Sequence, residues 1–357
     1  MKFARVLAVL VLLSAGSCAR FFGIPRSTEA KTYAVPTADG WKVSLVRYPA
    51  RGRPRGRPVL LCHGISANDR NMDLDEKRSL ARWLSAQGRE TWALSLRSAG
   101  ESDRADDTQG RPADFGFDAY WQEDLPAALA FILSHSRADA VDFVGHSMGG
   151  MIAYAYLSQG GTGIHAAVTL GSPTRFGWDA KADGLLVEWG SLFISPGGQV
   201  PSSLGGQLVI PLEALFDGDP VENFFYNPAN TSPEAFRRLL AYGTDSIPGG
   251  VAAQMLDLVR TGHFGSRDGA RNFRADLSNV QTPVMVVAGR LDRLAPAMAV
   301  RDGFRALGGP KEWLMLSEAT GSASEYGHMD LLLGDHAPND VFKPLLEFFE
   351  RHEKHSP

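Results

Sequence analysis

Short apolar runs alternate along this chain with stretches in which apolar residues recur at helical spacing. Six of these runs are bounded by turn-forming residues, at 58–62, 90–96, 140–144, 165–170, 283–288 and 312–316. Parallel strands that are buried on both faces read as unbroken apolar runs rather than as alternating ones. The pattern therefore predicts an α/β fold in which a mostly parallel sheet carries helices on both faces. Two further strands are expected within 32–48, around a turn at 38–40.

The alternation breaks once, between the strands predicted at 165–170 and 283–288. A structureless loop of that length is not expected in a compact domain, so residues 173–282 are interpreted as an inserted lid or cap over the ligand-binding edge of the sheet. Residues 30–172 and 283–355 would then form the core. The aromatic residues of the insert either pack among themselves or line a substrate cavity; they are Phe176, Trp178, Trp189, Phe193, Phe216, Phe224, Phe225 and Tyr226.

Residues 1–18 have the layout of an export signal. A short cationic start precedes an apolar run, 6–13, that is too short to cross a bilayer as a stable anchor. The segment resembles a bacterial lipoprotein signal, in which Cys18 becomes the lipidated first residue and anchors the protein to the membrane. Cleavage by an ordinary signal peptidase after Ser17 or Ala19 is the alternative. In both cases we expect an exported protein, either an envelope lipoprotein or a secreted or periplasmic one.

Charge and cysteine content exclude several classes of function. The formal net charge is −4, so no nucleic-acid partner is expected. The arginine-rich stretch 51–58 is expected to be a solvated loop, with contact to an anionic lipid or glycan as the alternative. Once Cys18 is removed or lipidated, Cys62 stands alone in an apolar run, which indicates a buried side chain and no disulfide. The nine histidines lack metal-ligand spacing, so neither a metal nor another cofactor is expected.

The segment Gly145-His-Ser-Met-Gly149 has the Gly-x-Ser-x-Gly spacing of a nucleophile elbow. In such an elbow the serine sits on a sharp turn from a strand into a helix, where large side chains two residues away would clash. The motif lies between the apolar run 140–144 and a helical pattern at 152–157, which is the context that this turn requires. Ser147 is therefore predicted to be a nucleophile at the positive end of a helix.

A serine hydroxyl needs a neighbouring base to take its proton. Where a serine occupies this turn, the acid and then the histidine follow it along the chain. Asp292 follows the predicted strand 283–288 and His328 follows 312–316, so both are expected beside Ser147 at the C-terminal edge of the sheet. His328 would act as general base and then as general acid, and Asp292 would orient its imidazole.

Each of these assignments has an alternative. Asp292 could instead be a turn residue, since aspartate is common in turns, and His328 could instead be an ordinary surface histidine. Asp330 is a rival acid, although a carboxylate two residues from the histidine would have difficulty reaching the ring nitrogen that faces away from Ser147. His63 also follows a strand, but a base there would break the expected chain order, which indicates a structural role.

Acyl transfer also requires hydrogen-bond donors for the oxyanion. One is expected to be the backbone N–H of Met148, directly after the nucleophile, and the other the N–H of Ile65, in the loop after the first buried strand. Loss of one such donor typically costs about 3–4 kcal/mol of transition-state stabilisation.

With these motifs the chain resembles the α/β-hydrolase superfamily, and within it the acid-lipase group of triacylglycerol and steryl-ester lipases. The similar segments are 58–64, 117–127, 144–149, 261–264, 289–295, 326–331 and 337–338. The resemblance covers most of 35–175 and 260–352 and little of the insert. It implies a serine hydrolase that cleaves carboxylic esters of small molecules or lipids, and it supports the roles given to Ser147, Asp292 and His328.

Other activities are compatible with the same residues. Some segments also resemble polyhydroxyalkanoate synthases and depolymerases; the synthases carry cysteine at the position of Ser147, which argues against synthesis. Thioesterases, amidases and acyltransferases would use the same three residues. Outside the enzymes, the alternative is a lipid-anchored binding protein that lacks catalysis.

Overall fold

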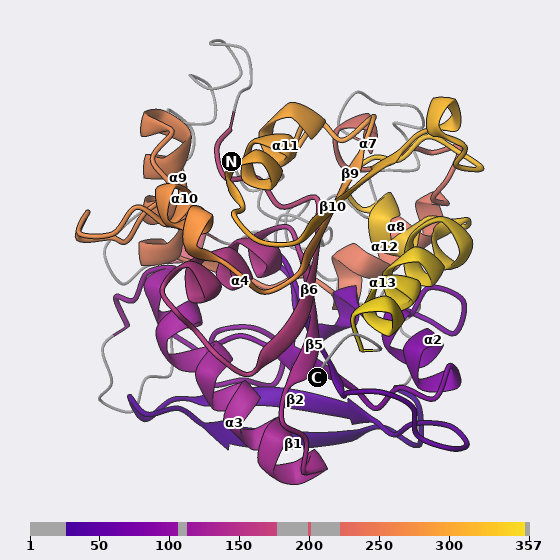
Figure 1. Cartoon of the computed structure of the whole chain (residues 1–357), viewed down its shortest axis with the longest axis horizontal. Coiled ribbons are helices and arrows are strands. Elements are labelled where there is room, and N and C mark those ends of the chain that lie inside the picture. The colour runs from indigo at the N-terminus through magenta and orange to yellow at the C-terminus, as the bar shows by residue number, and fades with distance from the viewer. Residues whose placement is uncertain (1–25, 106–112, 177–198, 201–221, 354–357) are drawn as a thin grey trace, which may run out of the picture.

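An eight-stranded sheet forms the centre of the protein, as seen in the computed structural model, which describes residues 26–105, 113–176, 199–200 and 222–353 (Figure 1). Its order is β1-β2-β4-β3-β5-β6-β9-β10. Among the described strands β2 runs against its neighbours, and the pairs from β4 to β10 are parallel. The strands are β1 Lys31–Pro36, β2 Lys42–Tyr48, β3 Val59–Cys62, β4 Thr91–Ser95, β5 Val141–His146, β6 Ile164–Leu170, β9 Val284–Gly289 and β10 Lys311–Leu316.

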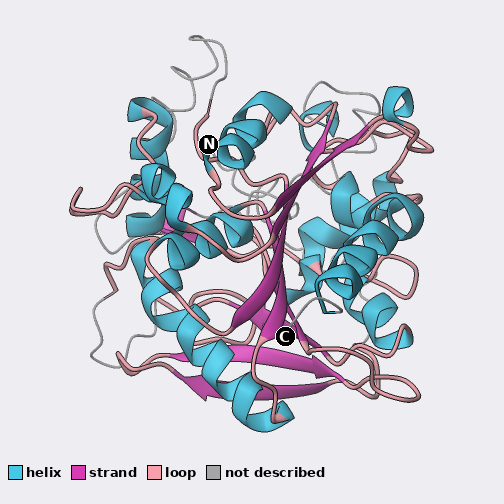
Figure 2. Ribbon diagram, viewed as in Figure 1, coloured by secondary structure: helices cyan, strands magenta, loops and turns pink. Residues whose placement is uncertain are grey.

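Helices cover both faces of this sheet (Figures 1 and 2). One face carries α3 (Leu125–Ser136), α4 (Met148–Ser158), α10 (Phe273–Asp276) and α11 (Ala297–Ala306). The opposite face carries α2 (Leu80–Ala86), α12 (Asp330–Leu333) and α13 (Lys343–Glu353). Short helical turns complete the core, at η1 Asp69–Asn71, η2 Tyr120–Asp124, η3 Leu277–Asn279, η4 Glu318–Thr320 and η5 Pro338–Phe342. The predicted α/β class, with helices on both faces, is confirmed.

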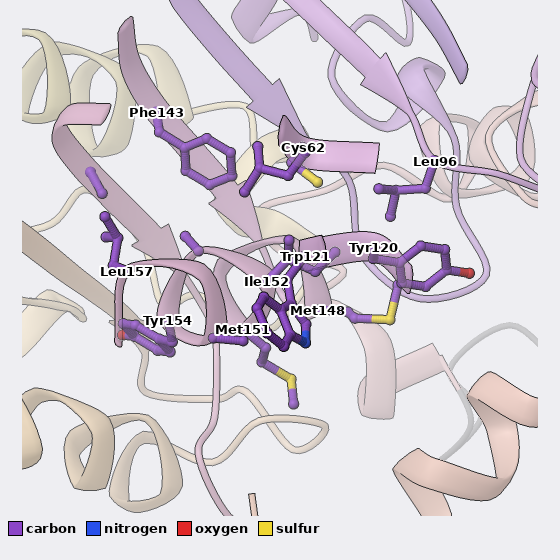
Figure 3. Packing of buried hydrophobic residues seen from close by; sticks show 14 of the residues in the cluster. Cys62, Leu96, Tyr120, Trp121, Phe143, Met148, Met151, Ile152, Tyr154 and Leu157 are labelled. Atoms are coloured by element: carbon purple, nitrogen blue, oxygen red, sulfur yellow. The ribbon is translucent and has the colours of Figure 1, made fainter. Parts of the chain in front are cut away.

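Each face of the sheet has its own apolar core. Successive side chains of a strand point to opposite faces, so Phe143 and Val144 of β5 belong to different clusters. Phe143 and Cys62 pack with Ile152 of α4 on one face, as Figure 3 shows. Val144 packs in the cluster that contains Leu345 of α13 on the other face. The central strands are buried on both sides, which explains why they read as unbroken apolar runs.

The described part of the predicted insert lies along the C-terminal edge of the sheet. It contains β7 (Gln199–Val200), α7 (Glu222–Phe225), α8 (Pro233–Tyr242), β8 (Ile247–Pro248) and α9 (Gly249–Thr261). Asn68 donates to the carbonyl of Tyr242 at 3.0 Å and to the carboxylate of Asp245 at 2.8 Å, which ties the end of α8 to the loop after β3. Four aromatic residues of the predicted insert lie outside the described residues: Trp178, Trp189, Phe193 and Phe216.

Local polar chemistry moves one predicted boundary. The helical spacing at 75–87 predicts a helix over that range, but α2 begins only at Leu80. Asp75 accepts the N–H groups of Lys77 and Arg78 at 2.9 Å each, which makes a turn there instead. Ser79 then caps the helix by accepting the N–H of Arg82 at 2.9 Å.

The predicted export signal, with Cys18, lies outside the described residues. Within residues 26–105, 113–176, 199–200 and 222–353, no helix is both long enough and apolar enough to span a bilayer.

Candidate active site

Ser147 stands on the sharp turn that joins β5 to α4. Its backbone has φ 53° and ψ −120°, a strained conformation for a residue other than glycine. A Cβ on Gly145 would collide with the backbone of Gly149, and one on Gly149 would collide with the carbonyl of Cys62. Glycines two residues before and after the serine therefore permit this turn, as the motif predicts. Met148 is the first residue of α4, so its N–H lies at the positive end of that helix.

His328 and Asp292 meet at the edge of the sheet where β9 and β10 end. The Nδ1–H of His328 donates to Asp292 Oδ2 at 2.7 Å, and the two side chains are nearly completely buried. The other carboxylate oxygen, Oδ1, accepts the N–H of Ala295 at 2.7 Å, which holds the acid in place. With the proton on Nδ1, the Nε2 atom of His328 is left as the acceptor.

Ser147, His328 and Ile65 line one cavity of about 410 Å³. The loop after β3 approaches the serine closely, since a Cβ on Gly64 would lie 3.0 Å from the Cβ of Ser147. The structure thus gathers the predicted nucleophile, base, acid and both predicted oxyanion donors at one edge of the sheet, although these residues are widely separated in the sequence.

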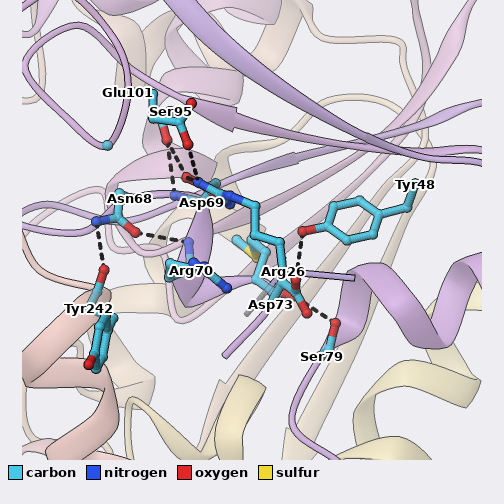
Figure 4. A network of polar contacts seen from close by, with 12 residues as sticks. Arg26, Tyr48, Asn68, Asp69, Arg70, Asp73, Ser79, Ser95, Glu101 and Tyr242 are labelled. Atoms are coloured by element: carbon cyan, nitrogen blue, oxygen red, sulfur yellow. Dashed lines mark hydrogen bonds and ion pairs between the residues drawn. The ribbon is translucent and has the colours of Figure 1, made fainter. Parts of the chain in front are cut away.

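The loop that carries Ile65 is held by buried carboxylates (Figure 4). Asp69 accepts the hydroxyl of Ser95 on β4 at 2.9 Å. Asp73 accepts the hydroxyl of Tyr48 on β2 at 2.7 Å. Because each bond reaches a different strand, the loop is fixed to the sheet, and the backbone beside Ser147 is positioned before any substrate binds.

His146, inside the serine motif, lies against His328 and is not predicted from the sequence. Its ring centroid lies 4.7 Å from that of His328, and its Nε2–H donates to the His328 carbonyl at 3.2 Å. The Nδ1 atom lies 3.2 Å from the Asn71 side-chain oxygen. Burial holds the pKa of His146 well below its ordinary value, so the ring is neutral. The one sequence signal for His146 is its position between Gly145 and Ser147 in the serine motif. The motif allows any residue there and so does not indicate what that residue contacts.

Asp330, the rival acid, bonds to groups other than the imidazole. It accepts the N–H of Asn227 at 2.8 Å, the N–H of Gly327 at 2.5 Å and the hydroxyl of Thr231. Burial raises the pKa of this carboxyl to about 6. Asp330 therefore connects the loop of His328 to the segment between α7 and α8.

His63 and Cys62 occupy structural positions. The Nδ1–H of His63 donates to the carbonyl of Gly64 at 2.8 Å, and its Nε2 accepts the N–H of Leu96 at 3.1 Å. Burial lowers the pKa of His63 to about 4 and raises that of the Cys62 thiol. In the described part of the chain, no three His, Cys, Asp or Glu side chains gather as a metal site would require.

Comparison with known proteins identifies the family. A family model described as the alpha/beta hydrolase fold matches residues 57–335. Triacylglycerol lipase 1 of Arabidopsis thaliana is 25% identical, over 93% of this chain and 90% of the relative. Poly(3-hydroxyalkanoate) polymerase subunit PhaC of Thiocystis violacea is 24% identical, over 84% of this chain and 83% of the relative.

A solved structure of a thermophilic esterase from Thermogutta terrifontis has a TM-score of 0.59 and 17% identity to this chain, and the match covers 90% of this chain and 99% of that one. At this identity the likeness shows the fold alone. The family model, by contrast, spans most of the sequence, including the serine turn and the loops after β9 and β10. The expected resemblance to lipases and esterases is confirmed, and the chain belongs to the α/β-hydrolase family.

Proposed function

We propose that this protein hydrolyses carboxylic esters through an acyl-enzyme formed on Ser147. The hydrogen bond between His328 Nδ1 and Asp292 Oδ2, at a cavity that Ser147 also lines, carries the proposal. This bond selects the tautomer in which Nε2 is free to accept a proton, which is the form that a serine nucleophile requires.

In the proposed reaction, the Oγ of Ser147 attacks the ester carbonyl carbon while His328 Nε2 takes its proton. The oxyanion is stabilised by the N–H groups of Met148 and Ile65. When the carbon–oxygen bond to the alcohol breaks, His328 returns the proton to the departing oxygen. Water then attacks the acyl-enzyme with the same histidine as base, which releases the acid and regenerates the serine. Asp292 holds the imidazole and stabilises its charged form.

We prefer ester over amide or thioester hydrolysis because of the relatives, and the lining of the site indicates which groups the ester carries. The Arabidopsis relative is named a triacylglycerol lipase. Apolar side chains make up most of the cavity lining around Ser147, among them Phe225, Leu239 and Met329. The substrate is therefore proposed to be a small-molecule or lipid ester with apolar groups.

Replacement of the nucleophile tests the proposal. Ser147→Ala is expected to lower kcat for p-nitrophenyl esters by at least about 10⁴-fold, because the acyl-enzyme can no longer form. Ser158→Ala, which removes a serine hydroxyl at the far end of α4, is the matched control and is expected to keep wild-type activity.

Labelling by a fluorophosphonate probe separates the alternatives. The wild type is expected to be labelled at Ser147, and the Ser147→Ala variant to stay unlabelled. Full activity in Ser147→Ala would overturn the proposal. A wild type that neither labels nor hydrolyses esters, thioesters or amides would favour a binding protein, and faster turnover of thioesters or anilides than of matched esters would change the substrate class.

We also propose that the protein is exported and anchored to a membrane by acylation of Cys18. The support is the cationic and apolar layout of residues 1–18. The mass of the mature N-terminus tests this directly: a diacylglyceryl cysteine at position 18 supports the anchor, whereas an unmodified start at residue 18 or 20 supports ordinary cleavage. Cys18→Ala is expected to release the protein from the membrane fraction.

A further inference from the structure

Two adjoining cavities meet at Ser147, and each is walled by a different helix of the predicted insert. The first, of about 250 Å³, is lined by Ala252 and Met255 of α9, and we call it the α9 chamber. The second, of about 410 Å³, is lined by Leu239 and Leu240 of α8, and we call it the α8 chamber. The reacting serine is thus the point from which two mostly apolar spaces extend.

Three apolar side chains belong to the lining of both chambers: Ile65, Ile247 and Leu294. They come from three different places, the loop after β3, strand β8 between α8 and α9, and the loop after β9. Because they line both spaces next to Ser147, they mark the boundary between the chambers, which we call the partition. A substrate that fills both must therefore cross this partition at the serine, which is where the ester bond would lie.

The two chambers differ in their access to the general acid. Among the described residues that line them, His328 belongs to the α8 chamber and is absent from the α9 chamber. A histidine that acts as general acid must reach the oxygen of the departing alcohol. The alcohol half of an ester is therefore placed on the side of α8, and the acyl half on the side of α9.

We propose that the site takes esters with an apolar group on each side of the ester bond, with the acyl chain in the α9 chamber and the larger, alcohol-derived group in the α8 chamber. This inference rests on the proposed hydrolysis at Ser147. Acylation breaks the carbon–oxygen bond to the alcohol, which leaves through the α8 chamber with the proton from His328. The acyl group stays in the α9 chamber until water releases it as the acid.

Two series of esters test the assignment of the chambers. One series holds the alcohol at ethanol and lengthens the acid from acetic to dodecanoic; the other holds the acid at acetic and lengthens the alcohol from ethanol to dodecanol. The wild type is expected to gain roughly fourfold in kcat/KM for each methylene that becomes buried. The gain should continue to longer chains in the alcohol series, because the α8 chamber is larger.

Filling one chamber at a time gives the decisive comparison. Ala252→Phe narrows the α9 chamber and is expected to lower kcat/KM for long acids by roughly tenfold or more, with the alcohol series changed by less than about twofold. Leu240→Trp narrows the α8 chamber and is expected to lower kcat/KM for long alcohols to a similar extent, with the acid series changed by less than about twofold. Ala253→Phe is the matched control, because Ala253 lies on the same helix but lines a different cavity.

Thermal melting establishes that each variant is folded. Should Ala252→Phe fail to fold, Leu256→Ala enlarges the same chamber and is expected to move the preferred acid to a longer chain without changing the alcohol series. A reversed pattern, or variants that change both series equally, overturns the assignment of the chambers. If the wild type hydrolyses esters but its kcat/KM does not change with chain length in either series, this inference alone is overturned. If the wild type hydrolyses no ester, both the proposed function and this inference are overturned.

Discussion

Two buried carboxylates lie near His328, one on the loop after β9 and one just after the histidine itself, and they serve different parts of the molecule. Asp292 accepts the Nδ1–H of His328 at 2.7 Å. Asp330, only two residues beyond the histidine, accepts the N–H of Asn227 at 2.8 Å and the hydroxyl of Thr231, both from the segment between α7 and α8. One carboxylate is bonded to the candidate base, and the other to the insert.

The contrast shows that proximity across a sheet edge outweighs proximity along the chain. Strands β9 and β10 are parallel neighbours, so the loops that follow them leave the sheet side by side. A carboxylate on the loop after β9 can therefore reach a ring nitrogen of His328, although the histidine itself lies on the loop after β10. Asp330 begins the short helix α12, which turns its side chain toward Gly327 and the insert.

Replacing Asp292 gives the largest expected effect on this comparison. In Asp292→Asn the amide can donate to Nδ1, which favours the tautomer that carries its proton on Nε2 and cannot accept one from Ser147. The kcat for p-nitrophenyl esters is expected to fall about 10⁴-fold, with little change in melting temperature. Steady-state kinetics and a thermal melt of the same preparation measure both quantities.

Asp330→Asn is the natural control, since it makes the same change in the neighbouring carboxylate. Its kcat is expected to stay within about tenfold of the wild type, because Asp330 is bonded to the insert. Equal losses of kcat in the two variants would mean that both carboxylates orient the base. A wild-type kcat in Asp292→Asn would remove Asp292 from the proposed mechanism.

For the free energy of unfolding the order should reverse: Asp330→Asn should lose more stability than Asp292→Asn. An amide at position 330 replaces one acceptor oxygen by a donor. At least one of the three groups that donate to Asp330, the N–H of Asn227, the N–H of Gly327 or the hydroxyl of Thr231, then loses this acceptor. Asp330→Asn is therefore expected to lower the free energy of unfolding by about 1–3 kcal/mol. Urea denaturation near pH 8, where the carboxyl of Asp330 is ionised in the folded protein, measures this loss. A smaller loss than in Asp292→Asn would contradict the division of roles between the two residues.

The core strands could be predicted from the sequence because of how they are buried. The apolar run 140–144 corresponds to β5, observed at Val141–His146, and the run 283–288 corresponds to β9 at Val284–Gly289. Helix α11 was not predicted, since Asp302 and Gly303 lie inside it and both disfavour helix. Its packing against β9 outweighs this local preference, and the helical spacing of Val300, Phe304 and Leu307 is the local signal for the packed face.

The serine motif and the order of acid and histidine along the chain were sufficient to predict the three central residues of the candidate site. The serine motif and the two strand ends predicted Ser147, Asp292 and His328, and the structure gathers them at one edge of the sheet. The contacts of His146 and Asp330 were not predictable. Each depends on residues that are distant in sequence, such as His328, whose carbonyl accepts the Nε2–H of His146, and a spacing pattern contains no information about hydrogen bonds over that range.

The pH dependence of the free energy of unfolding should distinguish Asp330→Asn from the wild type. Burial raises the pKa of Asp330 to about 6, above the ordinary value of about 3.9. Between these values the folded state binds more protons than the unfolded state, so the contribution of Asp330 to the free energy of unfolding falls as pH rises from about 4 to about 6. The slope can reach roughly 1.4 kcal/mol per pH unit.

Subtracting the curve of Asp330→Asn from that of the wild type isolates this contribution. Burial also raises the pKa of Asp124 to about 6, but Asp124 is present in both proteins and cancels in the difference. The stability advantage of the wild type is expected to be greatest below about pH 4 and to shrink as pH rises toward about 6. An advantage that grows with pH over this range would show that the folded state favours the ionised carboxylate.

The smallest expected effect concerns the contact between Asp330 and the insert. Thr231→Val keeps the shape of the side chain but removes the hydroxyl that Asp330 accepts, so the free energy of unfolding should fall by about 1 kcal/mol. Thr231→Ser restores a hydroxyl and should recover most of that loss. The kcat should change little, because the bond between His328 and Asp292 is untouched. A loss of activity comparable to that of Asp292→Asn, in a protein that melts like the wild type, would mean that the insert positions the base and that the two carboxylates do not act separately.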